Sequence, residues 1–278
     1  IRPSFSNGPR ALSFAQERLW FIEQMQASGW SYHMPVYRRV LGVLNLEALT
    51  QSLQELVRRH QILRTTYDSV DGKPVQKVSP TAALDMPLED LRTIPEEARQ
   101  KEALRLAAEE LQRPFDLTRD LMLRARVLRL ADEEHWLLLT LHHIASDGWS
   151  VGVALRELAA LYDAFAGGAP ALLPELPIQY ADYALWQRGW LKGKELDRQL
   201  SYWKETLAGA PNLLDLPADK PRPAALSSRG ADLKFKIPAP VAQSLRRLGH
   251  EERATPFMVL LAAFKTLLHR TSNVEDMV

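Results

Sequence analysis

The sequence predicts a layered fold in which helices and strands are mixed, either α/β or α+β. Two observations predict it. Several segments repeat apolar residues at the spacing of an amphipathic helix, while segments between them alternate apolar and polar residues or run continuously apolar, as strands do. One pair of predicted strands is separated by an Asp-Gly turn, which is typical of a hairpin. A bundle of helices alone would contain neither feature.

The composition is that of a globular protein, and it bears on whether nucleic acid or a membrane is a partner. Of the 278 residues, 46% are apolar and 25% are charged, and 35 Lys and Arg are balanced by 34 Asp and Glu, for a net charge of +1. This balance gives no electrostatic reason to expect nucleic acid or an anionic membrane as a partner. The longest apolar run, residues 257–264, is too short to span a bilayer.

The chain contains no cysteine, which excludes disulfides, cysteine-ligated zinc, iron–sulfur clusters and a cysteine nucleophile. It also lacks the glycine-rich phosphate-binding motifs of nucleotide and dinucleotide sites, so we expect no such cofactor. The first residues show no secretory signal pattern, and we expect a cytoplasmic protein. Because the chain begins with Ile rather than Met, we expect it to be cut from a longer protein.

The first 60 residues predict two helices and a strand. Residues 14–25 carry a helical apolar stripe that follows Ser13, a residue suited to an N-cap. Residues 36–43 are typical of a strand. Asn45 can cap a second helix, over residues 46–60, whose leucines fall on one face and whose last turn is basic.

The next segments predict a hairpin over residues 64–78, a charged helix over 95–113 and two strands. Residues 121–130 alternate apolar and polar side chains until the pattern slips near residue 129, as at a bulge. Residues 136–141 are almost entirely apolar, which is typical of a central strand covered on both faces. The apolar positions of the charged helix predict an inward face made of Leu104, Ala107, Ala108 and Leu111.

A Gly- and Pro-rich stretch, residues 166–170, predicts a boundary that divides the chain into 1–168 and 169–278. Beyond it we expect one long helix over 178–207, a short strand over 231–237 and two final helices. The long helix carries three aromatic residues at helical spacing, and this stripe is expected to pack in the core rather than to bind substrate. They are Tyr183, Trp186 and Trp190.

The segment that carries candidate chemistry is the end of the central strand, His142-His143, followed by Asp147 and Gly148. Side chains alternate along a strand, so the two histidines point to opposite faces and are not expected to share a metal ion. A histidine at a strand end suits a general base. Each residue alone also has a simple structural interpretation, as a core histidine, an N-cap or a turn, and the spacing leaves both interpretations open.

Four segments together resemble the condensation domains of nonribosomal peptide synthetases. Residues 142–148 read His-His-x-x-x-Asp-Gly, a motif that these domains share with chloramphenicol acetyltransferase and related acyltransferases. Residues 12–20, 59–65 and 180–187 resemble the first, second and fourth motifs of the family, in the family's order. The similarity runs over essentially the whole chain, so the resemblance is specific.

The resemblance implies chloramphenicol acetyltransferase-like lobes with a tunnel between them, of which this chain holds a complete N-terminal lobe and the first part of a second. Because the later motifs that complete the tunnel are absent, we expect weak or no condensation by these residues alone. The resemblance also implies peptide-bond formation between thioesters delivered by donor and acceptor carrier proteins, beside an adenylation domain. The substrates would ride on the phosphopantetheine of those carriers, with no cofactor bound by the domain itself. The opening residues, 13–20, resemble the subtype that accepts an L-configured donor.

The resemblance assigns a role to each candidate residue. His143 would be catalytic and face the tunnel, while His142 would be structural. Asp147 would form a structural ion pair with Arg64, and the backbone N–H of Gly148 would donate to the developing oxyanion. Because a free α-amine has a pKa of about 7.7, part of it is already nucleophilic, so His143 could act as a base or could orient the amine.

Two alternatives stay open at this point. The chain could be a stand-alone acyltransferase that uses a CoA thioester, or a catalytically silent module that recruits carriers or enzymes. Dependence on a carrier protein rather than CoA would separate the first alternative from condensation. The presence of His143, Asp147 and Arg64 argues against decay of the site.

Overall fold

The computed structural model of the chain describes residues 1–4, 8–25, 29–170, 173–211, 213–221, 230–231 and 233–278. It divides into two compact units, Ile1–Glu195 and Leu196–Val278, and each is described by itself. Among these described residues, no helix combines the length and the apolar character needed to cross a membrane.

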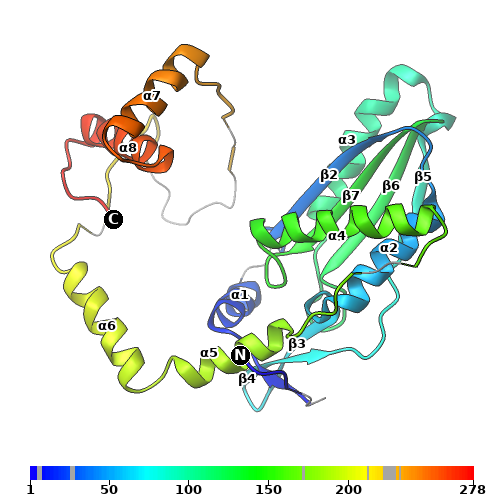
Figure 1. The fold of residues 1–278 in the computed structure, drawn as a ribbon, viewed down its shortest axis with the longest axis horizontal. Helices are drawn as coiled ribbons and strands as arrows, with labels where there is room; N and C mark the ends of the chain where they lie inside the picture. The colour runs from blue at the N-terminus through cyan, green and yellow to red at the C-terminus, as the bar shows by residue number, and fades with distance from the viewer. Residues whose placement is uncertain (5–7, 26–28, 171–172, 212, 222–229, 232) are drawn as a thin grey trace. The chain divides into compact units, whose positions relative to one another are not determined.

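A four-stranded sheet forms the centre of the first unit (Figure 1). Its order is β2 (His33–Leu41), β7 (Glu134–His142), β6 (Leu123–Ala131) and β5 (Leu88–Asp90), and only the β5–β6 pair is parallel. The inner position of β7 explains its continuous apolar run, because helices cover both faces of this strand. The register shifts between Arg129 and Ala131, at the irregularity predicted from the sequence.

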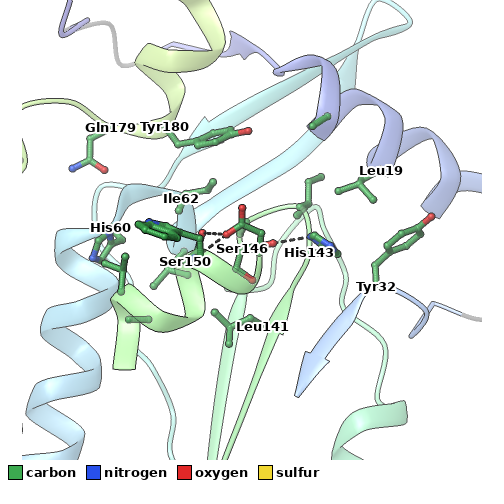
Figure 2. A pocket seen from close by; sticks show the side chains of 18 of the residues that line it. Leu19, Tyr32, His60, Ile62, Leu141, His143, Ser146, Ser150, Gln179 and Tyr180 are labelled. Carbon is green, nitrogen blue, oxygen red and sulfur yellow. Dashed lines mark hydrogen bonds between the residues drawn. The ribbon is translucent and has the colours of Figure 1, made fainter. Parts of the chain in front are cut away.

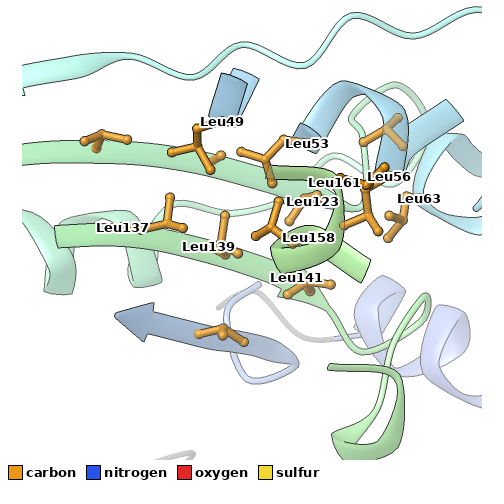
Figure 3. Close-up of a cluster of buried hydrophobic side chains, with 14 residues drawn as sticks. Leu49, Leu53, Leu56, Leu63, Leu123, Leu137, Leu139, Leu141, Leu158 and Leu161 are labelled. Carbon is orange, nitrogen blue, oxygen red and sulfur yellow. The ribbon is translucent and has the colours of Figure 1, made fainter. Parts of the chain in front are cut away.

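Helices cover the two faces of this sheet. On one face, α2 (Leu46–Arg59) and α4 (Gly148–Ala166) pack leucines against β6 and β7, and Figure 3 shows this cluster. On the other face, α3 (Glu96–Gln112) packs Ala103 and Leu106 against Leu128 and Leu138. As predicted, Asn45 caps α2, with its side-chain oxygen accepting the N–H of Ala48 at 3.0 Å.

The predicted inward face of α3 is wrong by about one residue. The buried side chains are those of Ala103, Leu106, Ala107 and Glu110, and Leu104 is 56% exposed. Glu110 explains the rotation, because its Oε1 accepts a hydrogen bond from Nε of Arg124, on β6, at 2.7 Å. A pattern search that treats every carboxylate as solvated cannot find a face that includes a buried ion pair.

A second, smaller sheet has the order β1 (Arg10–Ala11), β4 (Lys73–Val78) and β3 (Thr65–Val70). The predicted hairpin is confirmed as β3 and β4, joined by Asp71 and Gly72 with φ of 52° and 73°. The helix α1 (Phe14–Met25) follows β1, and its Leu19 packs in a cluster with Tyr67 and Ile144. This cluster therefore joins α1 to the segment that follows β7.

The single long helix predicted over 178–207 is wrong. The structure has α5 (Tyr180–Trp190) and α6 (Lys194–Thr206), separated near Gly193, whose φ of 53° lies in the left-handed region. The compact unit continues through α5 to Glu195, and the division predicted at residue 168 stays a prediction.

The aromatic stripe of α5 is not packed in the core as predicted. Trp186 and Trp190 are 40% and 46% exposed, and their rings stack with a centroid distance of 5.3 Å and an interplanar angle of 5°. The side chains that α5 buries are instead Ala181, Asp182 and Ala184. The alanines let this helix approach its neighbours closely. The prediction had instead assigned the buried face to the large aromatic side chains.

The second unit contains α7 (Ala239–Glu251) and α8 (Pro256–Ser272), close to the two final helices expected. The side chain of Thr255 caps α8 and accepts the N–H of Met258 at 3.3 Å. Within the described part of 231–237 no strand forms, so that prediction is wrong there; residue 232 lies outside the described residues.

Candidate active site

His142, the last residue of β7, is packed inside the first unit. Its side chain is 1% exposed, and its Nδ1 accepts the backbone N–H of Ile144 at 3.1 Å. The Nε2 atom therefore carries the ring proton, and it lies 3.4 Å from Oε1 of Glu23. Its ring meets Phe115 edge to face, with a centroid distance of 5.6 Å. These contacts hold the start of the turn that follows β7.

His143 points the other way and lines a cavity of about 440 Å³ (Figure 2). Its backbone N–H donates to the carbonyl of Tyr32 at 2.9 Å, which fixes the residue to the segment just before β2. Its Nδ1–H donates to the carbonyl of Ser146 at 2.8 Å. This bond places the ring proton on Nδ1 and leaves the Nε2 lone pair without a hydrogen-bond partner in the part of the chain that the structure describes.

Asp147 is the N-cap of α4. Its Oδ1 accepts the backbone N–H of Ser150 at 2.7 Å and the hydroxyl of Ser150 at 2.6 Å. These two bonds lower the pKa of Asp147 below its usual value. The sequence offered this role as the simple interpretation of Asp147, and the geometry supports it.

The ion pair expected between Arg64 and Asp147 does not form among the described residues. The Arg64 guanidinium donates instead to the backbone carbonyls of Ser79 and Arg58. Burial and the nearby charge of Arg58 lower the pKa of Arg64. The reason is competition for partners: the Asp147 carboxylate is used at the start of α4, and Arg64 finds acceptors where the hairpin meets α2. A structural role for Arg64 stays a prediction, with carbonyls as its partners.

Gly148 is the first residue of α4, and the first N–H groups of a helix have no acceptor within it. Its neighbours Asp147 and Trp149 line the cavity. A Cβ built on Gly148 would meet no atom within 4 Å, so open space lies beside this backbone. The role of its N–H as an oxyanion donor stays a prediction.

The wall of the cavity is largely apolar, with polar side chains gathered near His143 and His60. Three of the family-like segments meet here beside residues 142–148: Leu19 comes from the first, Ile62 from the second and Tyr180 from the fourth. Tyr180 reaches α1, since its hydroxyl lies 3.1 Å from Oγ of Ser13, and burial raises its pKa. The four segments thus converge on one cavity in space.

Two further side chains tie the N-terminal segment to α5. Asp182 is buried, and it accepts the backbone N–H groups of Ser4 and Gln179 at 2.8 and 2.9 Å. Arg10 lies 3.7 Å from Asp182 and is largely buried. Arg18 is exposed and lines the cavity.

The sequence profile of the condensation domain family matches residues 7–278. A linear gramicidin synthase polypeptide from Brevibacillus parabrevis is 47% identical over 267 residues, which cover 96% of this chain but only 3% of that protein. Phosphinothricin tripeptide synthetase PhsC from Streptomyces viridochromogenes is 45% identical over 272 residues, which cover 98% of this chain and 25% of that protein. The chain therefore spans a small part of these much longer relatives.

Solved structures share the fold, and two of them illustrate it. The X-domain from teicoplanin biosynthesis, in complex with OxyB, matches 98% of this chain and 60% of its own, with a TM-score of 0.83 and 30% identity. The four-domain nonribosomal peptide synthetase AB3403 matches 96% of this chain and 20% of its own, with a TM-score of 0.81 and 25% identity.

These findings assign the class: the chain belongs to the condensation domain family. The predicted resemblance and the predicted fold of mixed helix and sheet are both confirmed.

Proposed function

We propose that this chain forms a peptide bond between two carrier-bound thioesters, with His143 as its catalytic residue. The observation that carries the proposal is the orientation of this imidazole. Its Nδ1–H is held by a backbone carbonyl, and its Nε2 is left for the cavity that it lines. A histidine that served packing alone would be enclosed on both edges, as His142 is.

The proposed reaction needs little from the protein beyond positioning and proton transfer. The α-amine of the acceptor attacks the carbonyl carbon of the donor thioester, so a C–N bond forms. Nε2 of His143 accepts a hydrogen bond from the amine and takes its proton as the tetrahedral intermediate forms. The C–S bond then breaks, and the proton passes to the departing thiolate. Help of this kind is worth about 10²- to 10⁴-fold in rate.

The partners follow from the reaction. Donor and acceptor carrier proteins would bring phosphopantetheine thioesters, and an adenylation domain would load them. Membership of the condensation family, and the likeness to a four-domain synthetase, support these partners. An L-configured donor and a cytoplasmic location stay predictions from the sequence.

The test is an amide-forming assay with two loaded carriers, using the full natural polypeptide in which this sequence occurs. We expect peptide product on the acceptor carrier. A parallel reaction with an acyl-CoA donor separates condensation from a stand-alone acyltransferase. Product from CoA at the same rate would contradict carrier dependence, and no product from either donor would leave only a recruiting role.

A further inference from the structure

A second imidazole lines the same cavity and has no part in the chemistry proposed above. His60 follows α2, and its side chain is 21% exposed. In the view of Figure 2 it lies on one side of Ser146 and Ser150, with His143 on the other side. The two histidines therefore meet different parts of any molecule that fills the cavity.

A partly buried carboxylate holds His60 in place. Nε2 of His60 lies 2.6 Å from Oε2 of Glu157, on α4, and Nε of Arg59 donates to the same oxygen at 3.1 Å. The side chains of Glu157 and Arg59 are 15% and 5% exposed. Arg59 also donates to the carbonyl of Pro174, and its own carbonyl accepts Nε2–H of Gln179 at 3.0 Å. This network is anchored in three separate segments of the chain.

The network fixes which edge of the His60 ring can meet a ligand. An ionised carboxylate only accepts hydrogen bonds, so Nε2 of His60 carries the proton. With that edge against Glu157, the remaining polar atom is Nδ1, and the structure gives it no hydrogen-bond partner among the described residues. It presents a lone pair, oriented by the carboxylate behind it, beside a largely apolar wall. Such an atom recognises an N–H donor.

We propose that His60 is a substrate-binding residue that accepts a hydrogen bond from an N–H group of the thioester substrate. This inference rests on the proposed function, because that function supplies the ligand. Two N–H groups share the required chemistry: an amide of the pantetheine arm and the amine of the aminoacyl group. An anion at His60 itself is disfavoured, since the Glu157 carboxylate lies directly behind the ring and keeps Nδ1 an acceptor.

The test is a direct binding measurement on the full chain with two stable probes. One is leucyl-pantetheine in which a CH₂ group replaces the thioester sulfur, so that the probe carries no N–H that the substrate lacks. The other is its 4-methylpentanoyl counterpart, which lacks only the α-amine. With ¹⁵N-labelled histidine, we expect the Nδ1 resonance of His60 to move on saturation while Nε2 stays protonated. Movement with both probes identifies the pantetheine amide, and movement with the leucyl probe alone identifies the amine.

Two variants and a control extend the test. His60→Phe keeps a ring but removes the acceptor, and we expect it to weaken probe binding about twofold to tenfold, as loss of one neutral hydrogen bond does. His60→Gln can donate to Glu157 and still offer an oxygen, so it should restore most of the affinity. His250→Phe, at an exposed position of α7, should leave the affinity unchanged.

Three results would overturn the inference: an unmoved His60 resonance at saturation, wild-type affinity in a folded His60→Phe variant, or no binding of either probe. Binding needs no turnover, so the two proposals fail separately. A chain that binds the probes through His60 but forms no amide bond contradicts only the proposed function. An enzyme that forms the amide bond, but whose His60 Nδ1 resonance does not move when the probes are added, contradicts only this inference.

Discussion

At the scale of single residues, the adjacent residues His142 and His143 differ in the hydrogen-bond partner of the Nδ1 atom. Nδ1 of His142 accepts an N–H, whereas Nδ1 of His143 donates to a carbonyl, so the two rings carry opposite tautomers. Strand alternation predicts that they diverge, and that much could be read from the sequence. The tautomers could not, because they depend on where the turn after β7 places the groups of Ile144 and Ser146.

Asp147 also acts at this scale, as a cap. We expect Asp147→Ala to lower the free energy of unfolding by about 0.5–2 kcal/mol, the usual cost of a lost N-cap. Urea denaturation measures it, with Asp163→Ala, at an exposed position later in α4, as the matched control. A loss of about 3–5 kcal/mol would contradict the account, because that is the cost of breaking a buried ion pair and exceeds that of a lost N-cap.

The same carboxylate gives a pH dependence with a definite sign. The pKa of Asp147 is lower in the folded chain than its ordinary value of about 3.9, so its contribution is complete above that value. The contribution is lost as pH falls through the lowered pKa. Urea titrations from about pH 7 to pH 3 should therefore show the gap between wild type and Asp147→Ala narrowing with acid. A gap that widens would contradict this assignment.

At the scale of elements, α4 presents its first amide beside the cavity. Proline at this position removes an N–H that the helix does not use, and Asp147, with φ of −143° and ψ of −176°, has the extended backbone that precedes proline. We expect Gly148→Pro to fold but to lower turnover about 10²- to 10³-fold if that N–H holds the oxyanion.

Gly148→Ala is the control for this experiment. It keeps the N–H, and its Cβ enters open space, so turnover should stay close to wild type. Stability is measured for both variants by urea denaturation. Full activity in a folded Gly148→Pro variant would remove this amide from the mechanism.

The pairing of α3 with β6 offers a second test of an element. Glu110 and Arg124 are both largely buried, and burial lowers the pKa of Arg124 while Glu110 opposes that change. Glu110→Ala should cost about 3 kcal/mol of unfolding free energy, because a buried cation loses its counter-ion. Glu102→Ala, which breaks an exposed pair with Arg105 on the same helix, should cost far less, because solvent screens an exposed ion pair. Equal losses of unfolding free energy in Glu110→Ala and Glu102→Ala would contradict the burial of Glu110 on the inward face of α3.

At the scale of the whole molecule, the first unit unites segments that are far apart in the sequence. Periodicity predicted the central strand, the hairpin, the helices α1 and α2 and the bulge, because each follows from local side-chain patterns. Periodicity failed where contacts between residues distant in the sequence determine which side chains are buried and where a helix ends. Asp182 is buried by contacts with the N-terminal segment, and the break near Gly193 interrupts an otherwise helical apolar pattern.

The candidate site shows the same division. His143, Asp147 and Gly148 stand together in the sequence and could be predicted as a group. His60 could not be placed in that group from spacing alone, because only the fold brings the end of α2 and the side chain of Glu157 to the same cavity. Its position within the second family-like segment, residues 59–65, was the one available signal.

The central claim, that the Nε2 edge of His143 meets the reacting amine, is tested most directly by the turnover of His143→Ala with saturating loaded carriers. The account predicts a fall of about 10²- to 10⁴-fold with carrier affinity unchanged. Turnover within about twofold of wild type in the folded variant would contradict it, since the loss expected of a removed proton acceptor is far larger.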